Sequence, residues 1–322
     1  MSKSYMITNR RKRKKTYGSE PEKRGELYFL TAANSYDNNW EKYNEVEKAN
    51  FKDSLFEDLK NIQKRDEPAK MAIFIHGYNT SFDEAVAGYS SFGKSLKNHN
   101  WDGLLVGYSW PSEGTSLGYI EDRDDARESV TGFVHLMNLI KLVRMPAEKC
   151  YIDVSMISHS MGNYVLREGL SYFSKQVGYP RNDIYFTQTL LLGADISYNS
   201  LELDGSGRSI CDFSHRVTAY FNKNDNVLGL SRGVKHFGNR RLGRSGPSDY
   251  SKLPQNVVAV DCCKVANKEI CKKSSIHSSY FVISEELNDF VSTMNGIDRG
   301  AIPGRLEIAG TNRCGFQLIK KN

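Results

Sequence analysis

The sequence predicts an α/β fold in which helices cover both faces of a mostly parallel central sheet. Short apolar segments alternate with segments of helical periodicity along most of the chain, which is the pattern of strand–helix–strand units. Residues 71–75 are wholly apolar, as expected of a strand that is buried on both faces. Residues 151–170 place a strand-like run before a helix-compatible run, with Ser-His-Ser-Met-Gly between them. In such a sheet, a ligand site is expected at the carboxyl ends of the strands.

The predicted elements follow from periodicity and composition. Apolar and β-branched runs predict strands at residues 5–8, 27–33, 71–75, 104–108, 151–157, 184–192, 217–221 and 257–260. Helical spacing of apolar residues predicts helices at residues 51–62, 81–87, 126–143, 163–170 and 285–294. The second of these helices is expected to begin at a capping box, with Ser81 as the N-cap and Glu84 three residues on.

The chain has 322 residues, and we expect one domain over residues 1–322. Residues 71–294 are the expected catalytic core, and residues 1–33 are expected to supply edge strands with a basic loop at 9–26. The net charge is +6, and the six basic residues from Arg10 to Lys15 would account for it. We interpret this run as a solvated loop that could still contact an acidic partner. The alternative is a disordered basic arm that binds nucleic acid or an anionic membrane.

Composition also bears on compartment and metal binding. No apolar run reaches the roughly 18 residues that a transmembrane helix needs. The first residues lack the apolar stretch of a secretory signal. Of six cysteines, only Cys262, Cys263 and Cys271 cluster, and no histidine stands beside them at zinc spacing. We therefore expect free thiols, a cytoplasmic location and no bound metal.

Residues 158–162, Ser-His-Ser-Met-Gly, lie between a predicted strand and a predicted helix. A sharp strand-to-helix turn strains the backbone of its central residue and needs small neighbours two positions away. This is the G-x-S-x-G nucleophile elbow, with serine in the first glycine position. The turn would present Ser160 Oγ at the end of the sheet, and the N–H of Met161 would point at a developing oxyanion. The alternative is an ordinary strand–helix turn with an exposed serine.

Two further strand ends carry candidate residues. After the strand at 71–75 comes His76, which we interpret as a structural histidine that holds its loop by hydrogen bonds. Gly77 allows the backbone to run close to a substrate oxygen, so an N–H at Gly77 or Tyr78 is the expected second oxyanion donor. After the strand at 104–108, Trp110 would either line an acyl pocket as a substrate-binding residue or pack as a buried aromatic.

The acid and the base are expected at later strand ends. Asp195 and Asp225 both follow a strand, and both fit the chain order nucleophile, acid, base of α/β-hydrolases. Asp225 is the expected acid because it follows the second strand after the elbow, and Asp195 is the alternative acid or a loop brace. His277 is the expected base, since it lies after the last predicted strand and before the closing helix. His215 and His236 are its competitors.

Four segments carry a family resemblance: HGYN at 76–79, YSWPSEG at 108–114, DRDDARES at 122–129 and SHSMGN at 158–163. The chain resembles a set of mainly bacterial α/β-hydrolases that are catalogued largely as hydrolases of unknown function. The resemblance is strong over residues 71–170 and weaker through 193–195, 224–225 and 277. It implies the α/β-hydrolase fold and a Ser–Asp–His hydrolase, and it implies no substrate. Residues 8–10, Thr-Asn-Arg, also resemble the end of the opening strand in this family.

The expected function is hydrolysis of carboxylic esters, esterase- or lipase-like, with Ser160, Asp225 and His277 as the catalytic triad. The expected substrate is a small-molecule or lipid acyl ester, and the chemistry requires no metal or organic cofactor. Peptidases, thioesterases and acyltransferases use the same triad and remain alternatives. A non-catalytic protein is a further alternative. It would bind nucleic acid or a partner through the run from Arg10 to Lys15 and the stretch from Arg232 to Arg244.

Overall fold

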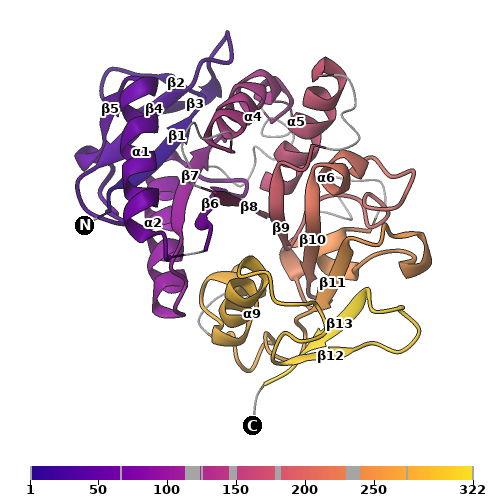
Figure 1. Cartoon of the computed structure of the whole chain (residues 1–322). Coiled ribbons are helices and arrows are strands. Elements are labelled where there is room, and N and C mark those ends of the chain that lie inside the picture. Colours follow the sequence, from indigo (N-terminus) through magenta and orange to yellow (C-terminus); the bar gives the residue numbers. More distant parts are fainter. Residues whose placement is uncertain are drawn as a thin grey trace.

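A computed structural model describes residues 2–65, 67–112, 124, 126–144, 151–177, 183–229, 240–272 and 275–320. Within these residues, eleven strands form one sheet (Figure 1). Across the sheet the strands are β12 (Arg305–Glu307), β13 (Gly315–Leu318), β11 (Val257–Asp261), β10 (Ser214–Phe221), β9 (Phe186–Leu192), β8 (Ile152–His159), β6 (Ala69–Ile75), β7 (Leu104–Ser109), β1 (Ser4–Thr8), β4 (Tyr28–Ala32) and β5 (Asn44–Val46). The strands from β13 to β1 are parallel, and the antiparallel strands β12, β4 and β5 flank them. The predicted mostly parallel sheet is confirmed.

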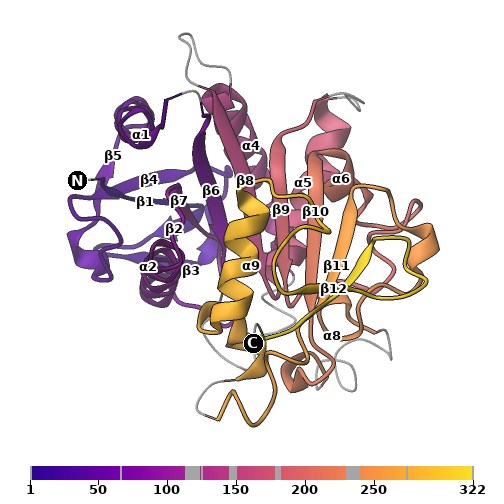
Figure 2. The ribbon, with the colours of Figure 1, turned by 60° about the horizontal axis from the view of Figure 1, so that its bottom comes forward.

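Helices cover both faces of this sheet, as predicted (Figure 2). One face packs against α1 (Lys48–Ile62), α4 (Val130–Arg144), α5 (Gly162–Val177) and α6 (Arg208–Asp212). The other face packs against α2 (Phe82–Asn98) and α9 (Ser284–Met294). In β6, Met71, Ile73 and Ile75 enter the first core, whereas Ala72 and Phe74 enter the second. This alternation explains why the whole segment is apolar.

The predicted helices and strands are present, with changes at their ends. Helix α2 begins at the predicted capping box, in which the Ser81 and Glu84 side chains each accept from the other residue's backbone N–H. It extends to Asn98 rather than to residue 87, because Tyr89 and Phe92 continue its buried face. Strands β12 and β13 have no counterpart among the predicted elements. They are three and four residues long, too short for a clear periodic signal.

Two predictions for the N-terminal region are wrong. Strands β1 and β4 are not edge strands, because β7 flanks β1 and β5 lies outside β4. The expected loop at 9–26 contains a hairpin of β2 (Arg10–Lys12) and β3 (Tyr17–Pro21), which protrudes from the body of the protein in Figure 1. Arg10, the first residue of the basic run, is buried rather than solvated.

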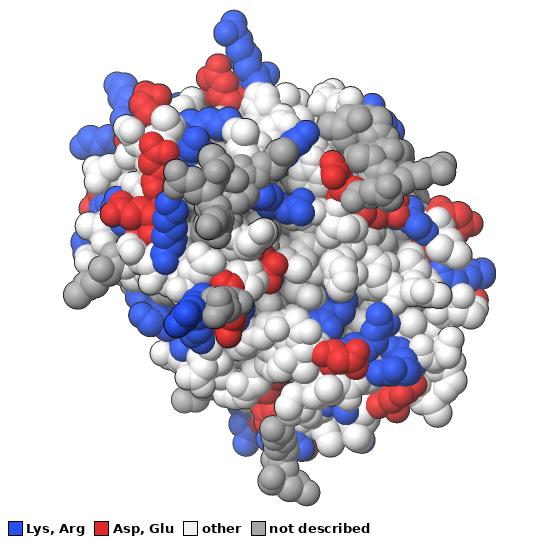
Figure 3. Space-filling model, in the orientation of Figure 1, with Lys and Arg blue, Asp and Glu red and all other residues white. Residues whose placement is uncertain are grey.

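The next three residues of the basic run pair with acidic side chains, and Lys14 and Lys15 are exposed. Arg11 and Arg13 both pair with Glu20 across the hairpin, and Lys12 Nζ lies 2.6 Å from Glu45 Oε2. On the face shown in Figure 3, lysine and arginine side chains are interspersed with aspartate and glutamate. The described part of that face has no continuous basic stripe of the kind that binds nucleic acid.

The parallel strands place the predicted site residues at one edge of the sheet. His76 follows β6, Ser160 follows β8, and Asp225 lies in the turn after β10. The strand order reverses at β6, because β7 and β8, the next two sheet strands in the chain, lie on its two sides. Open α/β sheets bind ligands in the crevice at such a reversal.

The described residues also bear on membrane insertion and on the state of the cysteines. None of the helices there is both long and apolar enough to cross a bilayer. The cysteines within those ranges, Cys211, Cys262, Cys263, Cys271 and Cys314, are free thiols as predicted. Cys150 lies outside them.

Candidate active site

Ser160 occupies the sharp turn between β8 and α5, where the sequence predicts a nucleophile. Its φ is +52°, in the left-handed region that residues with a β-carbon seldom adopt. Gly162 lets the start of α5 approach the end of the neighbouring strand β6, because a β-carbon there would lie 2.5 Å from the carbonyl oxygen of His76. The turn therefore has the strain and the close backbone approach that a nucleophile elbow requires.

Hydrogen bonds hold the backbone on both sides of this turn. Asn163 Nδ2 donates to the carbonyl oxygens of Ser158 and Ser160, at 3.1 and 3.0 Å. Ser158 Oγ donates to Asn163 Oδ1 at 2.7 Å. The Ser160 N–H donates to the Leu192 carbonyl at 3.0 Å, and the Ser160 carbonyl accepts from the Asp195 N–H at 3.1 Å. Sequence reasoning missed Asn163, whose one signal is an amide side chain in the first turn of the helix after the serine.

His277 and Asp225 form a hydrogen-bonded pair at the same edge of the sheet. His277 lies in η3 (Ile276–Phe281), and its Nδ1 is 2.6 Å from Asp225 Oδ2. A carboxylate only accepts, so Nδ1 carries the proton of the neutral ring and Nε2 is left as a proton acceptor. The sequence predicts this pairing of an acid with a base.

The turn around Asp225 fixes its fully buried carboxylate. The second oxygen, Oδ1, accepts from the N–H of Leu228 at 3.1 Å. The backbone carbonyl of Asp225 accepts from the Arg244 guanidinium. Asn222 Oδ1 accepts from the N–H of Asn224 at 3.0 Å and so holds the chain just before the acid. These contacts leave Oδ2 directed at His277.

Asp195, the alternative acid, has an arginine beside it. Its Oδ1 lies 3.2 Å from Nε of Arg241, and both side chains are buried. The pair joins the loop after β9 to the residue before α8 (Leu242–Ser245). Asp195 therefore braces a loop, which is what we expect of whichever aspartate is not the acid.

Gly77 brings the loop after β6 against the serine turn. A β-carbon at Gly77 would lie 3.1 Å from both Ser160 Cβ and His159 Nδ1. On the other side, a β-carbon at Gly193, after β9, would lie 3.5 Å from His277 Nδ1. Gly77 thus packs the loop after β6 against the serine turn, and Gly193 packs the loop after β9 against the ring of His277.

His159, the residue before the serine, packs against His277. The ring centroids are 4.8 Å apart, and His159 Nε2 lies 2.9 Å from the His277 carbonyl oxygen. Because a carbonyl only accepts, Nε2 of His159 carries a proton and donates. Burial, and then the nearby His277, lowers the pKa of His159 to about 3, so the ring is neutral. This contact to the candidate base is absent from the sequence predictions.

His76 has contacts that fit the structural role predicted for it. Its Nδ1 donates to the Gly77 carbonyl at 2.7 Å, and Trp110 Nε1 donates to the His76 carbonyl at 2.9 Å. The His76 and Trp110 rings stack with centroids 5.5 Å apart. Burial and the charge of Arg10 lower the pKa of His76 to about 3. Trp110 is 0% exposed, which favours the buried-aromatic interpretation over the substrate-binding one.

Other candidates lie away from this site or outside the described residues. His215 is exposed at the start of β10, the end of the strand opposite Asp225. His236 and residues 232–239 of the arginine-rich stretch lie outside the described residues, as do residues 113 and 114 of the YSWPSEG motif and residues 122, 123 and 125 of the DRDDARES motif. Arg241 and Arg244, from the described end of that stretch, contact Asp195 and Asp225 within the protein.

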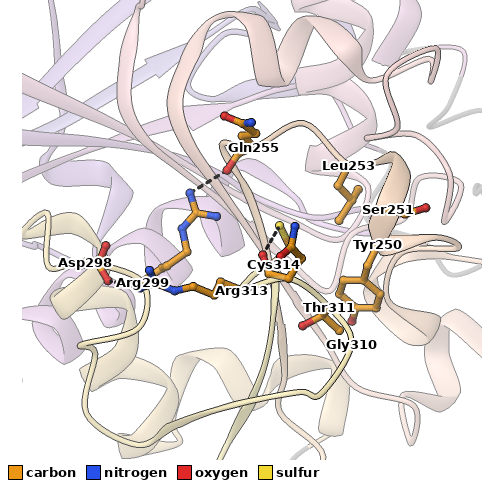
Figure 4. Close-up of a pocket in the computed structure, with 11 residues that line it drawn as sticks. Tyr250, Ser251, Leu253, Gln255, Asp298, Arg299, Gly310, Thr311, Arg313 and Cys314 are labelled. Atoms are coloured by element: carbon orange, nitrogen blue, oxygen red, sulfur yellow. Dashed lines mark hydrogen bonds and ion pairs between the residues drawn. The ribbon is translucent and has the colours of Figure 1, made fainter.

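A pocket of about 700 Å³ lies at the opposite end of the sheet from the candidate site (Figure 4). Its walls include Leu253 and Gln255, just before β11, and Cys314, just before β13. On its rim, Arg313 pairs with Asp298 at 3.1 Å. Because β11 and β13 begin here, the pocket is not part of the site at their carboxyl ends.

The sequence matches a known family over most of its length. Residues 49–293 match the family described as alpha/beta hydrolase of unknown function (DUF900). The chain belongs to this family. The matched range contains His76, Ser160, Asp225 and His277. The α/β-hydrolase fold expected from the sequence is thereby confirmed, and the observed strand topology agrees with it.

Individual relatives are more distant. The uncharacterized protein alr1448 of Nostoc sp. is 30% identical over 139 residues, which cover 36% of this chain and 35% of that protein. The chain thus matches about a third of that relative's length.

Solved structures with a similar fold include lipase B of Aspergillus fumigatus, at 11% identity and a TM-score of 0.40 over 70% of this chain and 52% of that one. A phospholipase, PlaB of Legionella pneumophila, in complex with thio-NAD, gives 11% identity and a TM-score of 0.36 over 75% and 66% of the two chains. A hyperthermophilic esterase of Pyrobaculum calidifontis gives 9% identity and a TM-score of 0.35 over 74% of this chain and 79% of that one. Likeness at this level indicates no substrate.

Proposed function

We propose that this hydrolase is a serine-dependent ester hydrolase that works through an acyl-enzyme, with Ser160 as nucleophile, His277 as base and Asp225 as acid. The observation that carries the proposal is the 2.6 Å hydrogen bond from His277 Nδ1 to buried Asp225, formed at the same sheet edge as Ser160. That bond selects the tautomer in which Nε2 accepts a proton, and such a tautomer is what a serine nucleophile needs of its base.

The acylation step follows from these positions. Ser160 Oγ attacks the carbonyl carbon of an ester while its proton passes to His277 Nε2. The imidazolium that forms is stabilised by the Asp225 carboxylate, which stays ionised. When the tetrahedral intermediate collapses, the C–O bond to the alcohol breaks, and the leaving oxygen takes the proton from His277.

Deacylation repeats the same steps with water. His277 takes a proton from a water molecule, whose oxygen attacks the acyl carbon, and then returns the proton to Ser160 as the acid leaves. The negative oxygen of each intermediate requires two N–H donors. We assign these to Met161, at the start of α5, and to Gly77 or Tyr78, in the loop that the close approach of Gly77 brings against Ser160.

We favour a carboxylic ester, from a small molecule or a lipid, as the substrate. Peptidases, thioesterases and acyltransferases use the same three residues, so the triad alone does not choose between them. The family description favours hydrolysis over acyl transfer. Initial rates on nitrophenyl esters of increasing chain length, compared with a matched anilide and a thioester, test this preference. A higher kcat/KM on the anilide than on any ester would contradict it.

Labelling by a fluorophosphonate probe tests the triad itself. The wild type should be labelled at one residue. Ser160→Ala should abolish labelling and reduce ester hydrolysis to a residual rate, about a thousandfold above that of water, which survives from binding and oxyanion contacts. A wild type that does not label, or a Ser160→Ala variant that still labels, would contradict the proposal. The first result would favour the non-catalytic alternative, in which the fold binds a partner.

A further inference from the structure

We propose that Arg10 is a positioning residue of the active site, which acts through Ser109 and His76 on the loop at residues 76–80. This loop carries Gly77 and Tyr78, the candidates for the second oxyanion donor. The inference rests on the function proposed above, and it assigns a catalytic consequence to a residue far from the triad in sequence.

Arg10 is buried at the base of the β2–β3 hairpin, with 1% of its surface exposed. Its guanidinium reaches two loops that border the candidate site. Nε donates to Ser109 Oγ at 2.9 Å, at the end of β7, and Nη1 donates to the Ser112 carbonyl at 3.2 Å. Nη2 donates to the Thr80 carbonyl at 2.6 Å, at the far end of the oxyanion loop. Nη1 also bonds the Gly18 carbonyl in β3, at 3.1 Å.

The chemistry of the partners fixes the direction of this chain of hydrogen bonds. His76 Nδ1 faces the Gly77 carbonyl at 2.7 Å, so it must donate, and in a neutral ring Nε2 must then accept. Ser109 Oγ lies 3.2 Å from Nε2 and is therefore the donor to it. Having given its only proton to His76, Ser109 accepts from Arg10 Nε. Arg10, Ser109, His76 and Gly77 thus form one directed relay.

The relay orients the peptide group that joins Gly77 to Tyr78. In a trans peptide the C=O and the N–H point in opposite directions. Because His76 holds the Gly77 carbonyl on one side, the N–H of Tyr78 is directed to the other. The donor of an oxyanion hole must lie within about 2.7–3.1 Å of the developing oxyanion, so a small rotation of this peptide would weaken the contact.

The far end of the loop is held by the same arginine. The Thr80 carbonyl accepts from Arg10, and the Thr80 N–H donates to Ser112 Oγ at 3.2 Å. Between the two ends, Asn79 has a φ of +56°, a strained conformation that persists only where the surroundings hold it. Arg10 bonds directly to the loop's last residue and, through Ser109, to its first, so we expect it to supply much of this restraint.

Lysine could not replace Arg10 in this role. The guanidinium directs donors along three diverging lines to Ser109, Thr80 and Ser112, whereas an ammonium on a flexible stem lacks that planar fork. Arg10→Lys keeps the positive charge and most of the side-chain volume, but it loses the planar arrangement of N–H donors. It therefore separates a positioning role from a general need for positive charge.

The decisive experiment compares Arg10→Lys and Ser109→Ala with the wild type and with Arg13→Ala. Arg13 lies on the same hairpin and pairs only with exposed groups among its described contacts, so it is the matched control. For each protein, kcat and KM on a nitrophenyl ester are measured, together with the inhibition constant of a trifluoromethyl ketone. This inhibitor forms a tetrahedral oxyanion on the serine. Urea unfolding establishes that each variant is folded.

The two relay variants should lower kcat by about 10- to 100-fold, less than the loss on deleting an oxyanion donor, because the donor is displaced and not removed. The inhibition constant should rise by a similar factor, while KM stays within twofold of the wild-type value. The shape of the pH profile of kcat/KM should be that of the wild type. Arg13→Ala should match the wild type in every measurement.

Wild-type kcat and inhibition in a folded Arg10→Lys variant would overturn the positioning role while Ser160-dependent labelling still upholds the triad. A loss that appears only in KM would also overturn it. Should Arg10→Lys fail to fold, Ser109→Ala decides alone, and wild-type kcat in that folded variant overturns the role. Absence of Ser160-dependent labelling in the wild type would instead defeat the proposed function, and this inference with it.

Discussion

The Nε2 atom of His159 lies 2.9 Å from the backbone carbonyl oxygen of His277. The residue beside the candidate nucleophile thus holds the main chain of the candidate base, and a buried neutral imidazole makes the contact. The bond joins the turn after β8 to η3 across 118 positions of sequence. It couples the position of His277 to that of Ser160 independently of Asp225.

We expect His159→Phe to lower kcat by about tenfold. Phenylalanine keeps the ring that packs against His277, but it leaves the His277 carbonyl without this donor, which costs about 1–3 kcal/mol when the group stays buried. His159→Gln, which retains an N–H donor, should lose less. Rates of ester hydrolysis and of fluorophosphonate labelling measure the effect. A His159→Phe protein that labels at the wild-type rate would show that the contact does not position the base.

The sequence predicts Ser160, Asp225 and His277 as candidates because each comes after a recognisable strand. The carboxyl ends of parallel strands meet at one edge, so strand order alone predicts that these side chains converge. The capping box of α2 is equally local, since Ser81 and Glu84 are three residues apart.

Arg10 could not be assigned in this way. In sequence it opens a run of six basic residues, which is typical of an exposed segment. Its partners Ser109 and Thr80 lie 99 and 70 positions away, and the pairing of β1 with β7 and of β7 with β6 brings them together. Strand β13 was unpredictable for the same reason, because its four residues are defined by pairing with β11. Contacts between distant segments leave no periodic signal in either segment.

The strained backbone of Ser160 leads to a prediction about stability. Ser160→Gly and Ser160→Ala should both lose the hydrolysis that depends on the nucleophile, but the glycine variant should be more stable by about 0.5–1 kcal/mol. A β-carbon in the left-handed region costs about 1–2 kcal/mol, which outweighs the greater chain entropy that glycine loses on folding. Urea unfolding measures the difference.

The matched control is Ser91, an exposed residue within α2. There the order should reverse, with Ser91→Gly less stable than Ser91→Ala by about 1 kcal/mol, because glycine is a poor helix former. If the glycine variant is the less stable one at both positions, the turn at Ser160 stores no strain.

Substitution of the two aspartates should have different effects, on kcat at Asp225 and on stability at Asp195. Asp225→Asn should lower kcat by on the order of 10³–10⁴-fold, because an amide can donate to His277 Nδ1 and so favour the wrong tautomer. Asp195→Asn should act mainly on the free energy of unfolding, lowering it by up to about 3 kcal/mol, since Arg241 stays buried beside a neutral group. Ester kinetics and urea unfolding of both variants check the separation. The reverse pattern, with kcat lost at Asp195 and kept at Asp225, would make Asp195 the acid.

Glu286 should make the stability of the protein depend on pH near neutrality. Its carboxyl is fully buried in α9, accepts from Ser279 Oγ at 3.1 Å, and faces Cys262, Glu285 and Asp289. Burial is the main cause that raises its pKa to about 8. Ser279 belongs to η3, the segment that also carries His277, so this hydrogen bond ties α9 to that segment.

The sign of the effect follows from proton linkage. In the unfolded chain the pKa of a glutamate is about 4.3, so between that value and about 8 the folded protein holds a proton that the unfolded chain has lost. The stability that this proton contributes is fully present below about pH 4.3 and is lost as pH rises towards 8, at up to about 1.4 kcal/mol per pH unit. Glu286→Gln cannot titrate and lacks this dependence.

The free energy of unfolding is therefore measured in urea for the wild type and Glu286→Gln at pH 5, 6.5 and 8. The wild-type value minus the variant value should decrease as pH rises across the three. Taking the difference cancels the pH dependence that His76 and His159 contribute, because both proteins contain these histidines. Their pKa values are lowered to about 3, so they destabilise both proteins equally as pH falls below about 6.5. A difference that stays constant from pH 5 to 8 would show that Glu286 is ionised in the folded protein throughout, and that burial does not hold its proton.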